Sequence, residues 1–173
     1  MALGSKTKHY ETPNHPYQGE RIASEHSLLD RYGLANKEEL WRAESRLRSY
    51  RREARDLLAQ EQDDPVVVRR TDEFLGRLER TGVLDEGDGL GDVLGLEVED
   101  VLERRLQTVA YRTGLANTPQ QARQFIVHGH VTIDGQRRRI PSYVVDVDEE
   151  GHIGFDENSP LADELHPERA EGQ

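Results

Sequence analysis

The chain has 173 residues, enough for one ordinary domain or two small ones, with 34% hydrophobic and 33% charged residues. Such a composition leaves little apolar material for a large core and is typical of a protein that a partner helps to order. The absence of a long apolar run, of an apolar leader and of any cysteine argues against a membrane span, secretion, a disulfide framework and cysteine-bound zinc. We therefore expect a soluble intracellular protein.

The net charge of −11 is distributed unevenly along the chain. Residues 61–100 hold 4 basic against 13 acidic side chains, and residues 144–173 hold 1 against 10. By contrast, residues 1–60 hold 11 against 9, and residues 101–143 hold 7 against 2. Of the 23 basic residues, 20 are arginines, which pair bidentately with phosphate and stack on bases. Two basic segments in an acidic chain indicate nucleic-acid binding.

The scarcity of lysine among many acidic residues is typical of proteins from a salt-rich cytoplasm. At about 1 M salt the Debye length is only about 3 Å, so surplus surface acid would not repel RNA over long distances. The alternative is a simply acidic, partly disordered protein.

Residues 1–19 show neither helical nor strand periodicity and contain two prolines, which predicts an extended arm. An arm that carries basic residues such as Lys6 and Lys8 is either a loose terminus or a segment that threads into a nucleic-acid partner. Residues 20–32 then predict a helix, and Gly33 is suited to end it.

A longer helix is predicted from Asn36, which can cap it, with Glu39 as the reciprocal partner of a capping box. Its apolar residues from Leu40 to Leu57 recur at intervals of three and four and form one buried stripe. Six arginines on the remaining surface are predicted to bind RNA: Arg42, Arg46, Arg48, Arg51, Arg52 and Arg55. A solvated face neutralised by neighbouring acids is the alternative, but only three acidic residues, Glu44, Glu53 and Asp56, are available to pair with them.

Residues 66–80 predict a further helix, and the Gly/Asp-rich residues 85–95 predict a turn-rich junction between two domains. The aspartates of this stretch do not have the spacing of an EF-hand calcium loop. The stretch also lacks the Lys-Ser/Thr ending of a phosphate-binding loop, so neither calcium nor a nucleotide is expected.

A single helix is predicted from 97 to 113, with Arg104, Arg105 and Arg112 opposite its apolar face. A second helix has a clear start at Thr118, followed by a proline suited to the first turn. Gln121 can complete its capping box, and the helix should end before Gly129.

A small antiparallel sheet should follow these helices. Val131–Ile133 predicts a strand, Asp134-Gly135 is a strong hairpin-turn signal, and residues 136–140 continue from it. Residues 144–147 alternate like a strand, with which residues 152–155 could pair.

Polar residues of the two helices and the hairpin could converge on one surface that reaches RNA phosphates, 2′-hydroxyls and splayed bases. The residues predicted to do so are Arg104, Arg105, Arg112, Thr118, Gln121, Arg123, Gln124, His128, Gly135, Arg137, Arg138 and Arg139. His128 and His130 straddle a helix end without a nearby cysteine or carboxylate pair, so a metal site is not expected. No catalytic grouping is evident, and we expect neither an enzyme nor a cofactor or small-molecule substrate.

These residues resemble the S-four RNA-binding domain at Arg105-Leu106, Gly114, Thr118, Ala122-Arg123-Gln124, His128-Gly129, Val131, Ile133-Asp134-Gly135 and Ile140-Pro141-Ser142-Tyr143. The upstream residues resemble the archaeal and eukaryotic branch of the S-four ribosomal protein family at Pro13, His15-Pro16, Tyr32-Gly33-Leu34, Asn36-Lys37, Trp41-Arg42 and Arg46-Leu47-Arg48. The family commonly has an aspartate after Arg-Leu, where this chain has Gln107. The capping or turn-pairing role of that aspartate is therefore not expected of Gln107.

The resemblance implies an α+β protein in four parts. These are an extended arm (1–19), a helical rRNA-binding domain (20–95), an S-four domain of helix-turn-helix plus small antiparallel sheet (97–157), and an acidic, flexible tail (158–173). It also implies a structural constituent of the small ribosomal subunit in the cytoplasm. Such a protein is a primary rRNA binder that helps nucleate assembly of the subunit body and contributes to translational accuracy, beside neighbouring ribosomal proteins.

Two alternatives use the same domain. One is an RNA-modifying or tRNA-charging enzyme, which would need a catalytic domain that residues 1–100 do not offer. The other is a ribosome-associated quality-control factor. The arm and the arginine-rich helix favour integration into rRNA over the reversible docking of such a factor.

Overall fold

The computed structural model describes residues 9–61 and 63–169, which form an α+β fold, as expected. The helices are α1 Gly19–Tyr32, α2 Lys37–Leu58, α3 Pro65–Arg80, α4 Leu90–Gly95, α5 Val98–Glu103, α6 Leu106–Arg112, α7 Pro119–His128 and α8 Val147–Glu150. The strands are β1 Val131–Ile133, β2 Gln136–Arg137 and β3 Ile153–Phe155, and a 3-10 turn, η1, follows at Pro160–Ala162. None of the helices in these residues combines the length and the apolarity needed to cross a bilayer.

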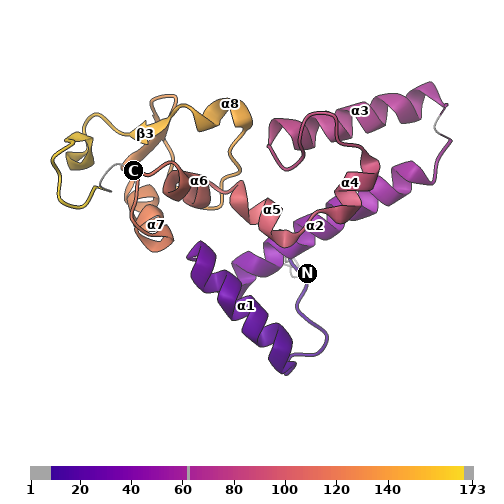
Figure 1. Ribbon diagram of the computed structural model, residues 1–173, viewed down its shortest axis with the longest axis horizontal. Helices are drawn as coiled ribbons and strands as arrows, with labels where there is room; N and C mark the ends of the chain where they lie inside the picture. The colour runs from indigo at the N-terminus through magenta and orange to yellow at the C-terminus, as the bar shows by residue number, and fades with distance from the viewer. Residues whose placement is uncertain (1–8, 62, 170–173) are drawn as a thin grey trace, which may run out of the picture.

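The long helix α2 organises the first of two clusters of buried side chains. The stripe predicted from Leu40 to Leu57 is buried against α3, α4 and α5, because its period of three to four residues keeps it on one face. Figure 1 shows α3 running alongside α2 and α1 projecting from its other end. The predicted junction at 85–95 contains α4, whose Leu90 and Val93 are buried in this cluster. This stretch is therefore part of a core and not only a connection.

The second cluster lies between α6, α7 and the sheet. The strand order is β2-β1-β3, with both pairs antiparallel. Asp134 and Gly135 have φ angles of 50° and 75°, the signature of the tight hairpin turn that the Asp-Gly pair predicts. The pairing expected between residues 144–147 and 152–155 is wrong, because β3 pairs with β1 and residues 147–150 form α8.

The single helix predicted from 97 to 113 is also wrong, because the chain breaks between α5 and α6. Arg105 is extended, with a ψ angle of 141°, and forms an isolated bridge with Val144. Leu106 N–H donates to the carbonyl of Tyr143 at 2.7 Å. Hydrogen bonds to a segment distant in sequence therefore replace those that a continuous helix would have made.

The predicted flexible tail is in part packed against the second cluster. Leu161 is 4% exposed, and its N–H donates to the Ser159 hydroxyl, which caps η1. Gln121 Nε2 also donates to the carbonyl of Glu168 at 2.9 Å. The described part of the tail therefore belongs to the fold.

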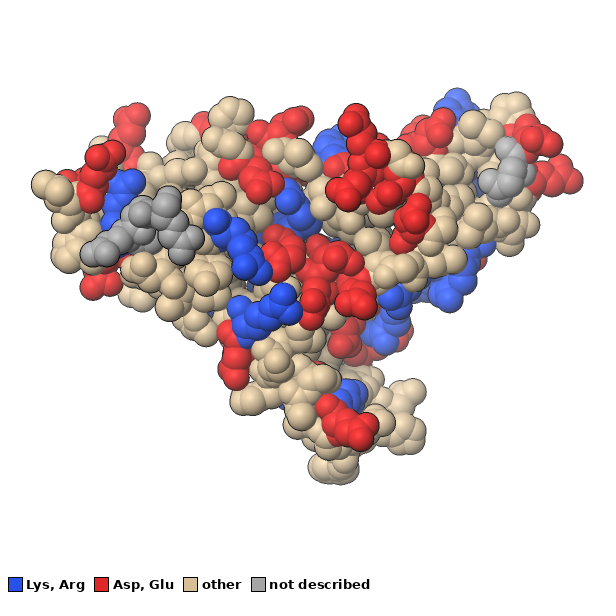
Figure 2. Space-filling model, in the orientation of Figure 1, with Lys and Arg blue, Asp and Glu red and all other residues tan. Residues whose placement is uncertain are grey.

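One face of the molecule carries a cluster of acidic side chains. Figure 2 shows acidic side chains gathered over α5, whereas basic side chains lie along the edge formed by α2. The basic edge along α2 is therefore a better approach for a polyanion than the acidic cluster over α5.

Candidate nucleic-acid interface

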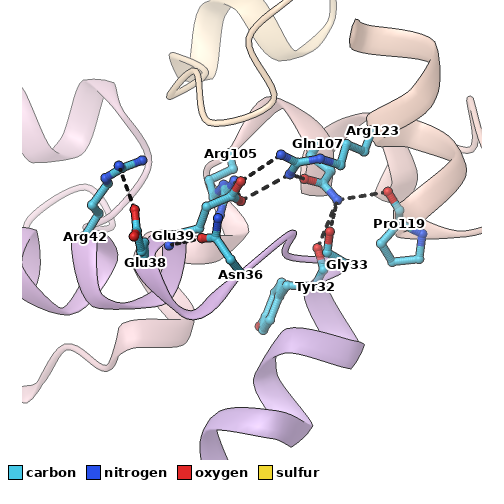
Figure 3. A network of polar contacts seen from close by, with 10 residues as sticks. All are labelled: Tyr32, Gly33, Asn36, Glu38, Glu39, Arg42, Arg105, Gln107, Pro119 and Arg123. Atoms are coloured by element: carbon cyan, nitrogen blue, oxygen red, sulfur yellow. Dashed lines mark hydrogen bonds and ion pairs between the residues drawn. The ribbon is translucent and has the colours of Figure 1, made fainter. Parts of the chain in front are cut away.

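Two arginines that the sequence assigns to RNA share one carboxylate inside the protein. Arg105 Nη2 lies 2.5 Å from Glu39 Oε2, and the Arg123 guanidinium contacts both Glu39 oxygens, at 2.7 and 3.2 Å. Figure 3 shows both arginines turned toward Glu39, which α2 supplies. Arg105 is only 5% exposed. Its guanidinium is therefore committed to Glu39 in the free protein.

Gln107 joins the same cluster from the first turn of α6. Its Nε2 donates to the carbonyls of Tyr32, Gly33 and Pro119 at 3.2, 2.8 and 3.0 Å, and its Oε1 accepts from Arg123 at 3.3 Å. Gly33 has a φ angle of 59°, and a Cβ there would lie 2.9 Å from Gln107 Nε2. The amide therefore ties the end of α1 to the start of α7, a contact that an aspartate could not make with three carbonyls.

Glu39 remains ionised within this cluster. Burial raises the pKa of its carboxyl, but hydrogen bonds from Arg123 and Arg105 outweigh burial, so the pKa lies below its ordinary value. Desolvation lowers the pKa of Arg105, against the effect of its hydrogen bond to Glu39. An arginine stays protonated at neutral pH even so. One carboxylate thus lies between two guanidinium groups, which leaves the trio with a net positive charge.

Sequence reasoning missed Glu39 and Gln107 as organising residues. Asn36 caps α2 as predicted, since its Oδ1 accepts from the Glu39 N–H at 3.1 Å. The Glu39 carboxylate, expected to complete that capping box, binds the two arginines instead. A local motif cannot reveal this, but the departure of Gln107 from the common aspartate was a usable signal.

The arginines of α2 divide into two sets. Three have partners within the protein: Arg42 pairs with Glu38 on the same helix, Arg48 pairs with Glu11, and Arg51 donates to the carbonyl of Leu96. The other three are exposed and have no ion-pair partner among the described residues: Arg46, Arg52 and Arg55. One of the nearby acids, Glu53, pairs with Arg77 of α3 at 3.0 Å. The helix therefore presents guanidinium groups whose charge the fold does not neutralise.

The end of the N-terminal arm lies along the first half of α2. The ring centroids of Tyr10 and Trp41 are 6.0 Å apart, and Glu11 N–H donates to the Ser45 hydroxyl at 3.2 Å. Lys6 and Lys8, predicted to contact RNA, lie outside the described residues.

The three hairpin arginines have different surroundings. Arg137 pairs bidentately with Asp156 at 2.6 and 2.8 Å, which lowers the pKa of that carboxyl to about 2. Arg138 lies over the ring of Tyr143, 5.0 Å from its centroid. Arg139 is exposed and has no ion-pair partner in the part of the chain that the structure describes. Arg138 and Arg139 are therefore the hairpin residues most available to a phosphate.

Arg104 and Arg112 do not share a helix face with Arg105, because the chain breaks between α5 and α6. Arg104 pairs with Glu150 at 3.1 Å and donates to the carbonyl of Val145. Arg112 is exposed but pairs with Glu103 at 2.9 Å. Both arginines thus have acidic partners that an RNA phosphate would have to displace.

The remaining predicted residues lie around α7 and the hairpin turn. Thr118 caps α7 by accepting from Gln121 N–H at 3.1 Å, whereas Gln121 Oε1 accepts from the N–H of Asn117, one residue before the cap. Gln124, His128 and Gly135 are exposed.

His128 does not belong to a recognisable metal site. Its ring lies 6.2 Å from that of His130, whose Nδ1 is 2.8 Å from the Ser159 hydroxyl. Within residues 9–61 and 63–169 there is no group of three or more potential metal-binding His, Cys, Asp or Glu side chains.

Comparison with known proteins places this arrangement in a family. The family model described as S4 domain matches residues 104–150. A small ribosomal subunit protein uS4 from Natronomonas pharaonis is 70% identical over 174 residues, covering 100% of both chains. The uS4 proteins of Haloarcula marismortui and Methanococcus aeolicus are 63% and 50% identical, over 100% and 95% of this chain and 99% and 93% of theirs. With such identity along its length, the chain belongs to the family of small ribosomal subunit protein uS4.

Proposed function

We propose that this chain is a structural, non-enzymatic constituent of the small ribosomal subunit. It binds the subunit's rRNA early, helps nucleate assembly of the subunit body and contributes to translational accuracy. The observation that carries the proposal is the 70% identity, along the whole chain, to a protein named as a component of that subunit. The acidic composition agrees with relatives from halophilic archaea.

The charge pattern supports a grip on RNA in two parts. One part is the row of exposed arginines on α2, and the other is the hairpin with Arg138 and Arg139. Phosphate contacts from guanidinium groups position a protein on folded RNA without reading its sequence. The stacking of Arg138 on Tyr143 keeps one guanidinium in place before RNA arrives, which reduces the entropy lost on binding.

The arginines held by acids contribute differently. The two halves of the molecule are the elements around the first buried cluster and those around the second. Arg105 and Arg123 hold these halves in one orientation through Glu39. The two arginines therefore affect RNA binding by fixing how the two parts of the binding surface are arranged. The sequence-based assignment of direct contacts is therefore best supported for the exposed arginines without acidic partners among the described residues, namely Arg46, Arg52, Arg55 and Arg139, and for the half-buried Arg138 on Tyr143.

Sedimentation of the tagged chain from its native host tests the proposal directly. In a sucrose gradient made with the KCl concentration of the host cytoplasm, the chain should sediment with small subunits and with their precursors. Its presence in precursors is expected because an early rRNA binder joins before later proteins. A chain found only in free fractions, or only with large subunits, would refute the proposal and favour a quality-control or RNA-modification factor.

Filter binding to small-subunit rRNA tests the proposed surface. The double variant Arg52→Ala/Arg55→Ala should bind more weakly, and its salt slope should fall by roughly 0.9 for each phosphate that these two side chains contact. Arg69→Ala/Arg80→Ala is a matched control, since both arginines are exposed on α3 outside the proposed surface. Equal affinities for both double variants would show that Arg52 and Arg55 do not contact RNA.

A further inference from the structure

A small cavity lies where α2 meets the break between α5 and α6. Its polar lining consists of Glu39, Arg42 and Arg46 from α2, Arg105 from the break, and Ser142. Its volume is about 110 Å³. That is the space of a few water molecules at about 30 Å³ each, and far below the roughly 300 Å³ at which small-molecule sites begin. The cavity therefore suits a small polar group, not a whole nucleotide.

The charges around this cavity favour an anion. Four guanidinium groups lie in or beside it, those of Arg42, Arg46, Arg105 and Arg123. Glu39 already binds two of them. Arg42 contacts Glu38 at 3.5 Å, with both side chains about half exposed, and such a pair contributes little. Two carboxylates among four guanidinium groups leave an excess of positive charge in a partly enclosed space, where screening by solvent is reduced.

Hydrogen-bond donors in the cavity are also left without partners. Arg46 has no ion pair, and the Ser142 hydroxyl has no hydrogen bond, with any described residue. Arg105, whose side chain is 6% exposed, has a buried Nε without a partner among the described residues. Arg46 and Ser142 are exposed, so their donors are open to an anion that enters the cavity, whereas the buried Arg105 guanidinium adds positive charge beneath it. A tetrahedral anion offers several acceptor oxygens at once.

We propose that this cavity seats one phosphodiester group of the rRNA backbone, held by Arg46, Arg42 and the Ser142 hydroxyl above the buried Arg105. The inference rests on the proposed function and deepens it by naming the chemical group and the residues that hold it. The cavity lies between α2, which carries Arg46, and Ser142, which lies two residues before Val144, the bridge partner of Arg105. A phosphate bound there is contacted by both halves of the protein and selects their docked arrangement.

The test measures binding of full-length small-subunit rRNA to the full chain, over the range of KCl in which circular dichroism shows the native fold. Arg46→Ala removes an exposed side chain without an ion-pair partner among the described residues, so the fold should be unchanged. Removing a charged hydrogen bond to phosphate should weaken binding by about tenfold or more and lower the salt slope by roughly 0.9. Arg69→Ala removes the same charge from α3 and should change the affinity by less than about twofold.

A double-mutant cycle distinguishes a shared phosphate from separate contacts. If Arg46 and Ser142 hold the same group, Ser142→Ala should weaken binding clearly in the wild-type chain and much less in Arg46→Ala. Independent effects of the two substitutions, or a Ser142→Ala variant that binds like wild type, would overturn the inference.

The wild-type measurement distinguishes a failure of the phosphate-site inference from a failure of the proposed function. If the wild-type chain binds rRNA but Arg46→Ala behaves like Arg69→Ala, the cavity does not hold a phosphate and the proposed function stands. If the wild-type chain neither binds this rRNA nor sediments with small subunits, the proposed function fails and the inference fails with it.

Discussion

The carboxylate of Glu39 offers the sharpest test of how the two halves of this protein are joined. In Glu39→Gln the side chain keeps its shape but loses its charge, so Arg105 and Arg123 lose their shared counterion. The amide can still accept hydrogen bonds through one oxygen, while its NH₂ group would face guanidinium donors. The substitution therefore leaves one buried positive charge without compensation.

The size of the effect follows from how deeply each partner is buried. Removing one partner of a buried ion pair costs about 3–5 kcal/mol. The side chain of Arg105 is 6% exposed and cannot reach solvent, whereas that of Arg123 is 28% exposed and can turn outward. We therefore expect the lower end, about 3 kcal/mol. For a chain of this length each kcal/mol shifts the melting temperature by about 2–4 °C, so Glu39→Gln should melt about 6–12 °C below wild type.

Thermal unfolding followed by circular dichroism in concentrated KCl measures this shift. Glu38→Gln is the matched control, because Glu38 directly precedes Glu39 on α2. Its side chain is 47% exposed and makes a weak ion pair with Arg42, at 3.5 Å. Its loss should cost at most about 0.5 kcal/mol. If the two variants melt within 2 °C of each other (about the shift expected for the control alone), the carboxylate of Glu39 is not what holds the halves together.

Further expectations concern pH, backbone strain and capping. Pairing holds the pKa of Glu39 below its ordinary value, so its contribution is present above the unfolded pKa of about 4.3 and is lost as the pH falls through the folded value. Urea unfolding at pH 5 and pH 3 (roughly the two sides of that unfolded value) should show a larger loss for wild type than for Glu39→Gln, and equal losses would contradict the pairing. Gly33→Ala should destabilise by at least about 1 kcal/mol more than Gly114→Ala in urea unfolding. Both positions have positive φ, but only at Gly33 would a Cβ meet atoms within 3 Å. Thr118→Ala should cost about 1 kcal/mol in the same assay, whereas Thr118→Ser keeps the capping hydroxyl; equal losses would show that the cap does not stabilise α7.

Several features could be predicted from the sequence because they depend on neighbouring residues. Asn36 and Thr118 cap their helices with side chains that reach only three residues ahead. Asp134-Gly135 forms the tight turn because glycine and aspartate tolerate positive φ. The stripe of α2 is buried because its spacing matches the helical repeat. The sequence also predicts a basic surface on α2, because the helix has more arginines than nearby acidic residues to pair with them.

What each arginine does was decided by residues distant in the chain. Arg105, in the break before α6, and Arg123, on α7, meet at Glu39, whose local sequence indicates only a capping role. The break before α6 forms because Leu106 donates to the carbonyl of Tyr143, a partner that no local helical periodicity can supply. Local sequence determined the caps, the turn and the basic helix. The tertiary structure decided which charges are neutralised, because burial makes an unpaired charge far more costly than an exposed one.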